Sequence, residues 1–281
     1  MIKIDYNAPH FILTFPYNQG DLKIVRALPL RDWDKVEKVW KVPQLAVKTL
    51  DTIPAQWTDE AQSIRQSIDN GLIELLEYKF DDSIKDTNGS LLRPYQQLGV
   101  NFLSKAKKAL LADEMGLGKS IQSIKVIVDS NLKRNLILCP STLKLNWRNE
   151  FIKHFNITPI VISGTKKERV KQWNAMETPY VIANYDLLRL DWEVIPKSWD
   201  SIIADEVVYL KHNTSARTKL AKKLKSPIRL ALSGLPLENN LMEFQSIMEW
   251  VRPEIVPSAY RFKYRYGVWD YGGKLIGYKN L

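Results

Sequence analysis

The sequence predicts an open α/β domain, in which helices cover both faces of a parallel sheet, preceded by a small α+β domain. Two observations carry this prediction. After residue 91, short and continuous apolar runs alternate with stretches whose apolar residues recur at helical spacing, as in a sheet buried on both faces. Before it, the polar run 81–90 is rich in turn-forming residues and separates off a region with a different pattern. We therefore expect domains at residues 1–85 and 91–281.

The first region mixes two patterns. Phe11–Phe15 and Leu22–Val25 are short β-like runs, and Asp59–Tyr78 has apolar residues at helical spacing. A small α+β domain is expected from this mixture.

The second region supplies the alternating elements. Its expected strands are Ala109–Ala112, Asn135–Cys139, Ile160–Ser163, Tyr180–Ala183, Ser201–Ala204 and Ile228–Ser233. Its expected helices are Gly118–Asp129, Thr142–His154, Lys166–Met176 and Thr214–Leu224. In open sheets of this kind, ligands bind at the carboxyl ends of the strands.

Composition excludes several classes of protein. Of the 281 residues 45% are apolar, enough for a substantial core, so disorder throughout is excluded. The apolar runs are too short to cross a bilayer, the first residues lack the apolar stretch of a secretory signal, and one cysteine excludes a disulfide framework. We expect an intracellular protein, cytoplasmic or nuclear according to its host, with no membrane partner.

The positive charge lies in the second region. The chain has a formal net charge of +10, yet residues 1–80 contain 10 basic and 11 acidic side chains. The excess in the remainder indicates a polyanionic partner, although a solvated lysine-rich surface would give the same count.

Residues 112–120, Ala-Asp-Glu-Met-Gly-Leu-Gly-Lys-Ser, form a phosphate-binding loop of the Walker A type. Gly116 and Gly118 allow successive backbone N–H groups to surround phosphate oxygens. Lys119 can reach the β- and γ-phosphates, and the Ser120 hydroxyl can ligate Mg²⁺. Asp113 stands where the strict pattern has its first glycine. Alone, such a loop could be a plain connection between a strand and a helix.

Two acids end a later apolar run, Ser201–Ala204. Asp205 is expected to hold Mg²⁺ with Ser120, and Glu206 to orient and deprotonate an attacking water. An N-capping pair is the alternative. Together with Lys119, the two acids favour hydrolysis of a nucleoside triphosphate, with ATP and Mg²⁺ as cofactors.

From about residue 91, the chain resembles the first, RecA-like ATPase lobe of the Swi/Snf-type helicases of superfamily two. The resemblance rests on motifs in order: Leu92–Gln96, Asp113–Ser120, Cys139–Trp147, Ser163-Gly164, Asn184-Tyr185 and Ala231–Asn240. It implies nucleotide binding by Arg93, Gln96, Met115, Gly116, Leu117, Gly118, Lys119 and Ser120, with Gln96 on the adenine. It implies DNA binding by Ser141, Thr142, Lys144, Gly164, Asn184 and Tyr185. Coupling of nucleotide state to DNA would belong to Ser233 and Gly234.

The chain departs from this family's pattern after Glu206. Val207 and Val208 stand where alanine and a polar residue are usual, and Leu235 replaces a threonine. The missing polar side chain puts the coupling of ATP hydrolysis to DNA in question, although a valine pair could also improve local packing. The family's arginine finger belongs to a second lobe, so we expect these 281 residues alone to bind ATP, to hydrolyse it slowly and to need such a lobe as partner.

Residues 9–55 resemble the HARP-type module of annealing helicases and fork-remodelling relatives, which implies a role in DNA repair. The resemblance rests on Phe11, Phe15, Tyr17, the run 24–29, Trp33-Asp34 and the run 38–43. Aromatic side chains beside Arg31, Lys38 and Lys41 could stack on bases. Alternatively, Trp33 and Trp40 form the core of a small β-rich domain.

Three further features are weaker. The basic run 217–225 reads as a solvated helix face. The run 260–266 alternates like a strand, whereas the family resemblance places a helix there, and we follow the resemblance. His154 and His212 have no partners at metal-ligand spacing, so no zinc site is expected.

The sequence as a whole predicts the first motor lobe of an ATP-dependent DNA translocase that acts on branched or forked DNA, or on duplex with a single-strand junction. One alternative is a non-catalytic half-motor that binds DNA or a partner protein and is switched by ATP. Another is a different P-loop ATPase or kinase, which DNA would not stimulate.

Overall fold

A computed structural model describes residues 1–8, 10–28, 31–43, 46–76, 92–175, 177–237, 241–254, 256–269 and 275–278. They divide into two compact units, one formed by Met1–Tyr78 with Glu254–Pro257 and the other by Lys79–Pro253 with Ser258–Leu281. The expected domain boundary at 81–90 lies outside the described residues. Each unit is considered by itself.

The first unit is a five-stranded sheet in the order β3-β4-β2-β1-β5, with three helices. Only the β1–β5 pair is parallel. Its elements are β1 Ile2–Asn7, β2 His10–Thr14, α1 Gln19–Ala27, β3 Asp32–Asp34, β4 Val39–Pro43, α2 Val47–Leu50, β5 Ala55–Trp57 and α3 Asp59–Leu76.

The expected β-like run at Leu22–Val25 is wrong, because these residues lie in α1. The Asn18 side chain caps this helix by accepting a hydrogen bond from the Asp21 N–H at 2.7 Å. Val25 then packs in the core. The other two expected elements are confirmed: the run from Phe11 lies in β2, and the helix from Asp59 is α3.

The core of this unit lies on one face of its sheet. Cross-strand pairing places Ile4 opposite Leu13 and Phe11 opposite Val42, and all four side chains are fully buried. Helical residues that complete the core are Val25, Val47, Leu50 and Ala61.

Trp33 and Trp40 pair across β3 and β4 at the margin of this core, with ring centroids 5.2 Å apart. Trp33 is 40% exposed, so the alternative that both tryptophans form the core is wrong for Trp33.

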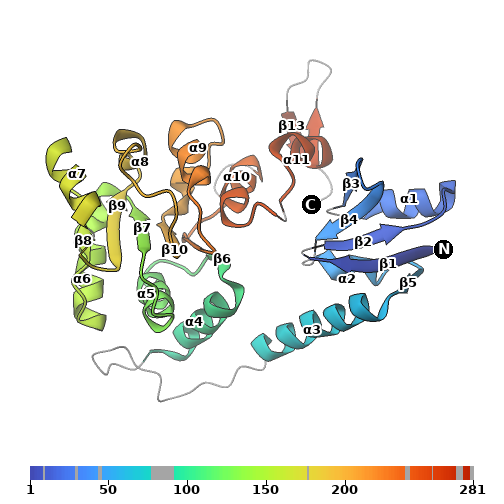
Figure 1. The fold of residues 1–281 in the computed structure, drawn as a ribbon, viewed down its shortest axis with the longest axis horizontal. Helices are drawn as coiled ribbons and strands as arrows, with labels where there is room; N and C mark the ends of the chain where they lie inside the picture. The colour runs from blue at the N-terminus through green and yellow to red at the C-terminus, as the bar shows by residue number, and fades with distance from the viewer. Residues whose placement is uncertain are drawn as a thin grey trace. The chain divides into compact units, whose positions relative to one another are not determined.

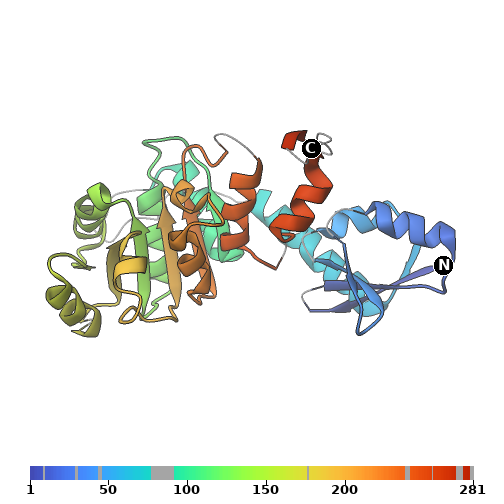
Figure 2. The same ribbon diagram turned by 90° about the horizontal axis from the view of Figure 1, so that it is seen from above.

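The second unit contains a six-stranded, entirely parallel sheet in the order β6-β11-β10-β7-β9-β8 (Figure 1). Its strands are β6 Lys108–Leu111, β7 Asn135–Cys139, β8 Ile160–Val161, β9 Tyr180–Asn184, β10 Ser201–Asp205 and β11 Ile228–Leu232. All six expected strands are confirmed, with β8 two residues shorter than expected. The parallel strands run side by side when the molecule is seen from above (Figure 2).

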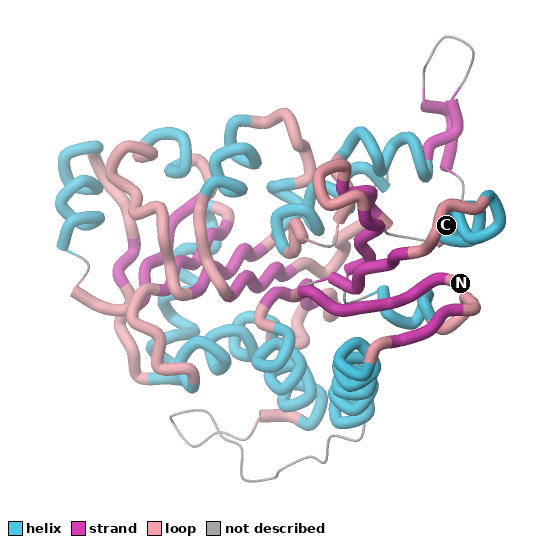
Figure 3. The backbone as a smooth tube through the Cα atoms, turned by 45° about the vertical axis from the view of Figure 1, so that its right-hand side comes forward, coloured by secondary structure: helices cyan, strands magenta, loops and turns pink. Residues whose placement is uncertain are grey.

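Helices cover both faces of this sheet, so that the strands form a middle layer (Figure 3). One face packs against α4 Pro94–Ala106, α5 Lys119–Asp129 and α6 Lys144–Phe155. The other packs against α7 Lys166–Ala175, α8 Leu187–Leu190, α9 Ala216–Lys223 and α10 Leu241–Val251. Two short 3₁₀ turns, η2 Ser141–Leu143 and η3 Val207–Leu210, follow strands β7 and β10. The expected α/β fold is therefore confirmed.

The last described elements are α11 Ala259–Tyr266 and a hairpin of β12 Gly267–Trp269 and β13 Leu275–Tyr278. The helix expected at 260–266 from the family resemblance is confirmed, and its alternating pattern does not make a strand. Cys139, the single cysteine, is buried at the end of β7. Within the described ranges, none of the helices combines the length and the apolar character needed to cross a membrane.

Candidate nucleotide site

The phosphate-binding loop connects β6 to α5 at the carboxyl edge of the sheet. Gly116 and Gly118 have φ angles of +84° and +74°, a region that glycine enters without the strain of a side chain. Gly118 is the N-cap of α5, so the positive end of that helix faces the loop. A Cβ added at Gly116 would meet no atom within 4 Å, which leaves the inner side of this turn open. Such a turn can cradle an anion.

Lys119 is folded over its own loop. Its ammonium group donates hydrogen bonds to the backbone oxygens of Asp113, at 2.7 Å, and Glu114, at 3.0 Å. The Asp113 carboxylate in turn accepts a hydrogen bond from the Gln122 side chain at 3.0 Å. Gln122 is fully buried on α5 and also donates to the Leu117 carbonyl at 3.3 Å. Asp113, which replaces the first glycine of the strict pattern, is thus a fixed part of the loop.

Gln96 joins its motif to the phosphate-binding loop. Its side-chain oxygen accepts from the Arg93 N–H at 3.0 Å, and its amide nitrogen donates to the Leu117 carbonyl at 3.3 Å. A Cβ at Gly118 would lie 2.4 Å from this amide nitrogen, so any side chain at Gly118 would displace Gln96. The two predicted nucleotide-binding segments therefore lie together. A contact between Gln96 and adenine stays a prediction.

Asp205 ends β10 as a buried carboxylate held on both oxygens. One oxygen accepts from the Trp147 indole N–H at 2.7 Å, and the other from the Glu206 N–H at 3.0 Å. Burial raises the pKa of Asp205, while these two hydrogen bonds and the positive charge of Lys119 oppose the rise. Lys119 is therefore close enough to act electrostatically on Asp205, as a shared site requires.

Glu206 has a left-handed backbone, with φ +46° and ψ +57°. A residue other than glycine in this region carries strain, and such strain concentrates at functional sites. Glu206 occupies the N-cap position of the 3₁₀ turn η3, where the alternative interpretation expects its side chain to cap. No side-chain capping bond is made at this position.

Tyr185 lies beneath Asp205. Its hydroxyl donates to the Asp205 backbone oxygen at 2.7 Å, and its ring stacks on Tyr209 with centroids 5.3 Å apart. Arg217 lies over the Tyr209 ring at 5.1 Å and forms an ion pair with Asp186 at 2.8 Å. Because the Tyr185 side chain is only 2% exposed, it cannot make the direct DNA contact expected of it, and its position is that of a support for Asp205.

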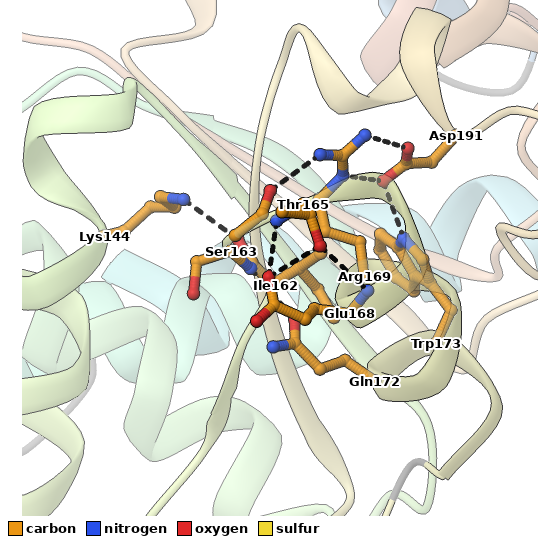
Figure 4. A network of polar contacts seen from close by, with 10 residues as sticks. Lys144, Ile162, Ser163, Thr165, Glu168, Arg169, Gln172, Trp173 and Asp191 are labelled. Carbon is orange, nitrogen blue, oxygen red and sulfur yellow. Dashed lines mark hydrogen bonds and ion pairs between the residues drawn. The ribbon is translucent and has the colours of Figure 1, made fainter.

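The other residues expected to contact DNA lie near the carboxyl edge of the sheet. Ser141 and Thr142 are exposed in η2, directly after β7, and Asn184 ends the neighbouring β9. Lys144 donates to the Ile162 carbonyl at 2.9 Å, which links the start of α6 to the turn that contains Gly164 (Figure 4).

Gly164 has a φ angle of +88°, and the turn is closed by side chains from α7. Glu168 accepts hydrogen bonds from both the N–H and the hydroxyl of Thr165, and Arg169 donates to the Gly164 carbonyl at 2.8 Å. Arg169 also binds both carboxylate oxygens of Asp191, which accepts a third bond from Trp173 (Figure 4). The conformation of this turn is thus fixed from within the unit.

The two residues expected to couple nucleotide to DNA lie beside the phosphate-binding loop. Ser233 N–H donates to the Leu111 carbonyl at 3.2 Å, and a Cβ at Gly234 would lie 3.4 Å from Met115 Cγ. Residues 238–240 of this motif are outside the described part of the chain. Val207 is fully buried and Val208 packs against the same cluster, so the unusual valines extend the core.

The residues around the phosphate-binding loop fit a nucleoside triphosphate with Mg²⁺. The open turn at Gly116, the α5 N-terminus and the Lys119 ammonium suit phosphate oxygens. In the described ranges, no three His, Cys, Asp or Glu side chains gather as a metal cage. Mg²⁺ is usually held by one or two protein groups together with phosphates, which is what Ser120 and Asp205 can offer.

Two structural partners were not foreseen from the sequence. Trp147 was assigned to a DNA-contacting motif, but its indole reaches a carboxylate 58 residues away. Gln122, in the first turn of α5, donates a hydrogen bond that fixes the Asp113 carboxylate. The signal in the sequence for Gln122 is a polar residue at a position where helical spacing predicts burial. The sequence holds no signal for the contact between Trp147 and Asp205.

The comparisons with known proteins agree with this geometry. A family model described as "SNF2-related domain" matches residues 95–268. An "Uncharacterized ATP-dependent helicase" of Mycoplasma pneumoniae is 34% identical over 65% of this chain and 19% of its own length. The "ISWI chromatin-remodeling complex ATPase ISW1" of Saccharomyces cerevisiae is 31% identical over 67% of this chain and 18% of its own.

One solved structure extends the comparison to the fold. The "Sulfolobus solfataricus SWI2/SNF2 ATPase core in complex with dsDNA" superposes with a TM-score of 0.60 and 29% identity, over 67% of this chain and 41% of the other. The chain thus spans about a fifth of the length of the two curated relatives.

Proposed function

Because the chain belongs to the SNF2-related family, we propose that it is the ATP-binding and DNA-contacting part of an ATP-dependent DNA translocase. The observation that carries the proposal is the meeting of three segments at one edge of the sheet. β6, β11 and β10 are neighbouring parallel strands, so the phosphate-binding loop and Asp205 both lie at their carboxyl ends. Gly234, which follows β11, lies against Met115 of the loop. A site for phosphates, a site for Mg²⁺ and the motif that follows β11 are therefore neighbours.

Each side chain has a defined part in hydrolysis. The loop N–H groups and Lys119 bind and orient the phosphates, and Ser120 and Asp205 would hold Mg²⁺. When bound, the ion supplies positive charge to the phosphate oxygens. Glu206 orients the attacking water and accepts its proton. Lys119 has to exchange its bonds with the Asp113 and Glu114 carbonyls for bonds to phosphate.

DNA is the proposed polyanion. The solved relative is in complex with dsDNA, and the exposed residues Ser141 and Thr142 lie at the carboxyl edge of the sheet. Contacts of this kind go to phosphates, so binding would depend little on sequence and strongly on salt. We further propose branched or forked DNA as the preferred substrate, with residues 1–85 as a HARP-like module that engages the junction. A second ATPase lobe is the proposed partner.

Within the first unit, the basic residues proposed for the junction differ in their surroundings. Lys41 forms ion pairs with Asp34 at 2.9 Å and Glu37 at 2.8 Å, and these hydrogen bonds raise its pKa to about 12. Lys38 is exposed in the turn between β3 and β4. The proposed stacking residue in this module is Trp33, whose ring is partly exposed beside Trp40.

One observation favours a second candidate, a half-motor that is switched by ATP without efficient coupling. Val207 is fully buried where the family usually continues with alanine, and Val208 packs against the same apolar cluster in place of the family's usual polar side chain. A chain that binds ATP and DNA but does not hydrolyse ATP would identify this non-catalytic candidate.

The test uses ATP binding and ATP hydrolysis by the 281-residue chain, with and without forked and plain duplex DNA. We expect Lys119→Ala and Glu206→Gln to remove hydrolysis, with Lys119→Ala also weakening nucleotide binding. Lys125→Ala is the matched control, because Lys125 lies on the same helix and pairs with Asp129 at its solvent-exposed side. Stimulation by DNA supports the translocase, and equal stimulation by forked and plain duplex contradicts the preference for branches. Loss of hydrolysis in the control as well would contradict the assigned site.

A further inference from the structure

We propose that the outer face of α11 binds an unpaired stretch of DNA, with Tyr260 and Tyr264 as a stacking surface. The inference rests on the proposed function, which supplies DNA as the ligand, and it assigns a contact that the motifs above do not include. The helix itself is well defined at its start, where the Ser258 side chain caps it.

The inner and outer faces of α11 carry different aromatic residues. Phe262 and Tyr266 lie on one side, with ring centroids 4.6 Å apart, and are partly buried. Tyr260 and Tyr264 are each 80% exposed. At a spacing of four residues, both lie on one face of the helix, one turn apart. The first pair is partly shielded from solvent, and the second is largely exposed.

The charge of the same helix is of one sign. Arg261, Lys263 and Arg265 lie among the tyrosines, and Ala259–Tyr266 contains no Asp or Glu. Arg261 and Lys263 are exposed, so the surface of α11 around the two tyrosines is positively charged.

Flat exposed rings among cations match the chemistry of unpaired nucleic acid. Each unpaired base offers an apolar face for stacking on tyrosine, and each phosphate offers a negative charge. Duplex DNA has its base faces stacked on one another, so it could use the cations of α11 but not the rings. This difference identifies the single strand as the ligand.

The experiment measures affinity of the full 281-residue chain for fluorescent single-stranded and duplex DNA of equal length. We expect the double variant Tyr260→Ala with Tyr264→Ala to bind single strands at least ~30-fold more weakly, because stacking contributes about 1–3 kcal/mol per base and two stacking rings are removed. Duplex affinity should change less than about threefold. The matched double variant to Phe keeps both rings and should retain single-strand affinity within about twofold. Both exposed tyrosines can be replaced without disturbing the core, which circular dichroism would verify.

Charge is tested separately. Lys263→Ala should weaken the binding of both single-stranded and duplex DNA. It should also reduce the slope of log K against log salt concentration by about one. Lys219→Ala with Lys223→Ala removes two exposed lysines of α9 and should leave the preference between single-stranded and duplex DNA unchanged.

Several results would overturn the proposal. The first is an unchanged affinity for single strands in the tyrosine-to-alanine variant. The second is an equal loss of affinity for duplex, because it would mean that the rings contact the DNA backbone and not the bases. Unchanged DNA affinity with altered self-association would assign this face to a protein contact. If the tyrosine variants bind DNA like the unaltered chain while DNA still stimulates hydrolysis, only the proposed role of α11 is rejected. If the unaltered chain binds no DNA, the proposed function falls with it.

Discussion

Two buried tryptophan–aspartate pairs lie in the described part of the second unit, and the two aspartates have different hydrogen-bond partners. In each, an indole N–H donates to a carboxylate, from Trp147 to Asp205 at 2.7 Å and from Trp173 to Asp191 at 3.1 Å. Arg169 binds both oxygens of Asp191 at 2.7 and 2.8 Å. At Asp205 the other hydrogen bond comes from a neutral backbone N–H.

The difference appears in the direction of the two pKa values. Burial opposes ionisation at both sites, but the hydrogen bonds from Arg169 and Trp173 outweigh it and lower the pKa of Asp191. At Asp205 burial wins, and the pKa is raised. The charge of Asp191 is neutralised by Arg169, so this ion pair stabilises the fold. Asp205 accepts its hydrogen bonds from neutral donors, so its negative charge would be available to Mg²⁺.

The largest expected difference is in stability. Asp191→Asn should lower the free energy of unfolding by about 1.5–3 kcal/mol, because it leaves the partly buried Arg169 guanidinium without its charged partner. Asp205→Asn should leave that free energy unchanged or raise it, because it removes a desolvated charge. Urea unfolding at neutral pH, followed by tryptophan fluorescence, measures both. Similar losses in the two variants would remove the distinction.

Replacing the indoles sharpens the comparison at the proposed ion site. Trp147→Phe removes a hydrogen bond to a charged group, a loss of roughly 1.5–3 kcal/mol. We therefore expect about tenfold or more Mg²⁺ to be needed for nucleotide binding, measured with a fluorescent ATP analogue. Trp173→Phe is the matched control and should keep the Mg²⁺ requirement of the unaltered chain, since Arg169 still holds Asp191. A shift of equal size in the control would show that general loosening of the core is responsible.

The pH dependence of stability should have opposite signs at the two carboxylates. The folded-state pKa of Asp191 lies below its ordinary value of 3.8, so its contribution is present above pH 3.8 and is lost as the pH falls through the folded pKa. The folded-state pKa of Asp205 lies above 3.8, so its ionisation costs stability as the pH rises from 3.8 through the folded pKa.

Unfolding free energies between pH 3 and 7 should accordingly show the two asparagine variants diverging from the unaltered chain as the pH rises. Asp191→Asn should fall below it and Asp205→Asn should match or exceed it. Parallel curves would contradict the assigned directions.

The smallest expected effect concerns the support beneath Asp205. Tyr185→Phe removes the hydroxyl that donates to the Asp205 backbone oxygen and should lower the free energy of unfolding by about 1 kcal/mol. Tyr209→Phe, on the exposed partner of the same stack, should change it by less than about 0.5 kcal/mol. Denaturant unfolding of the two variants side by side decides whether the buried hydroxyl matters.

The fold of the second unit could be predicted because its strands have a strong local signal. Runs such as Asn135–Cys139 are buried from end to end and stand between amphipathic helices, so the pattern had one interpretation. The prediction of a β-like run at Leu22–Val25 was wrong for the opposite reason. Four residues fit either a strand or one turn of a helix, and the Asn18 cap that decides between them lies outside the run.

For the candidate site, the sequence predicted the residues that belong to motifs and missed the ones that hold them. The loop and the acids are contiguous, and their spacing carries the chemistry. The bonds from Trp147 and Tyr185 to Asp205 cross 58 and 20 residues of chain, and only the register of β7, β9 and β10 brings them together. Tyr185 shows the consequence, since its motif indicated DNA while its burial depends on tertiary packing.

The position of Cys139 has a practical consequence for following motion in this protein. It is the single sulfhydryl of the chain, it is fully buried at the end of β7, and burial raises its pKa to about 12. Maleimides and disulfide reagents are attacked by the thiolate, which this residue hardly populates at neutral pH. A cysteine introduced on the surface would therefore take a dye selectively, and distances between labelled sites could be measured without removing the native sulfur.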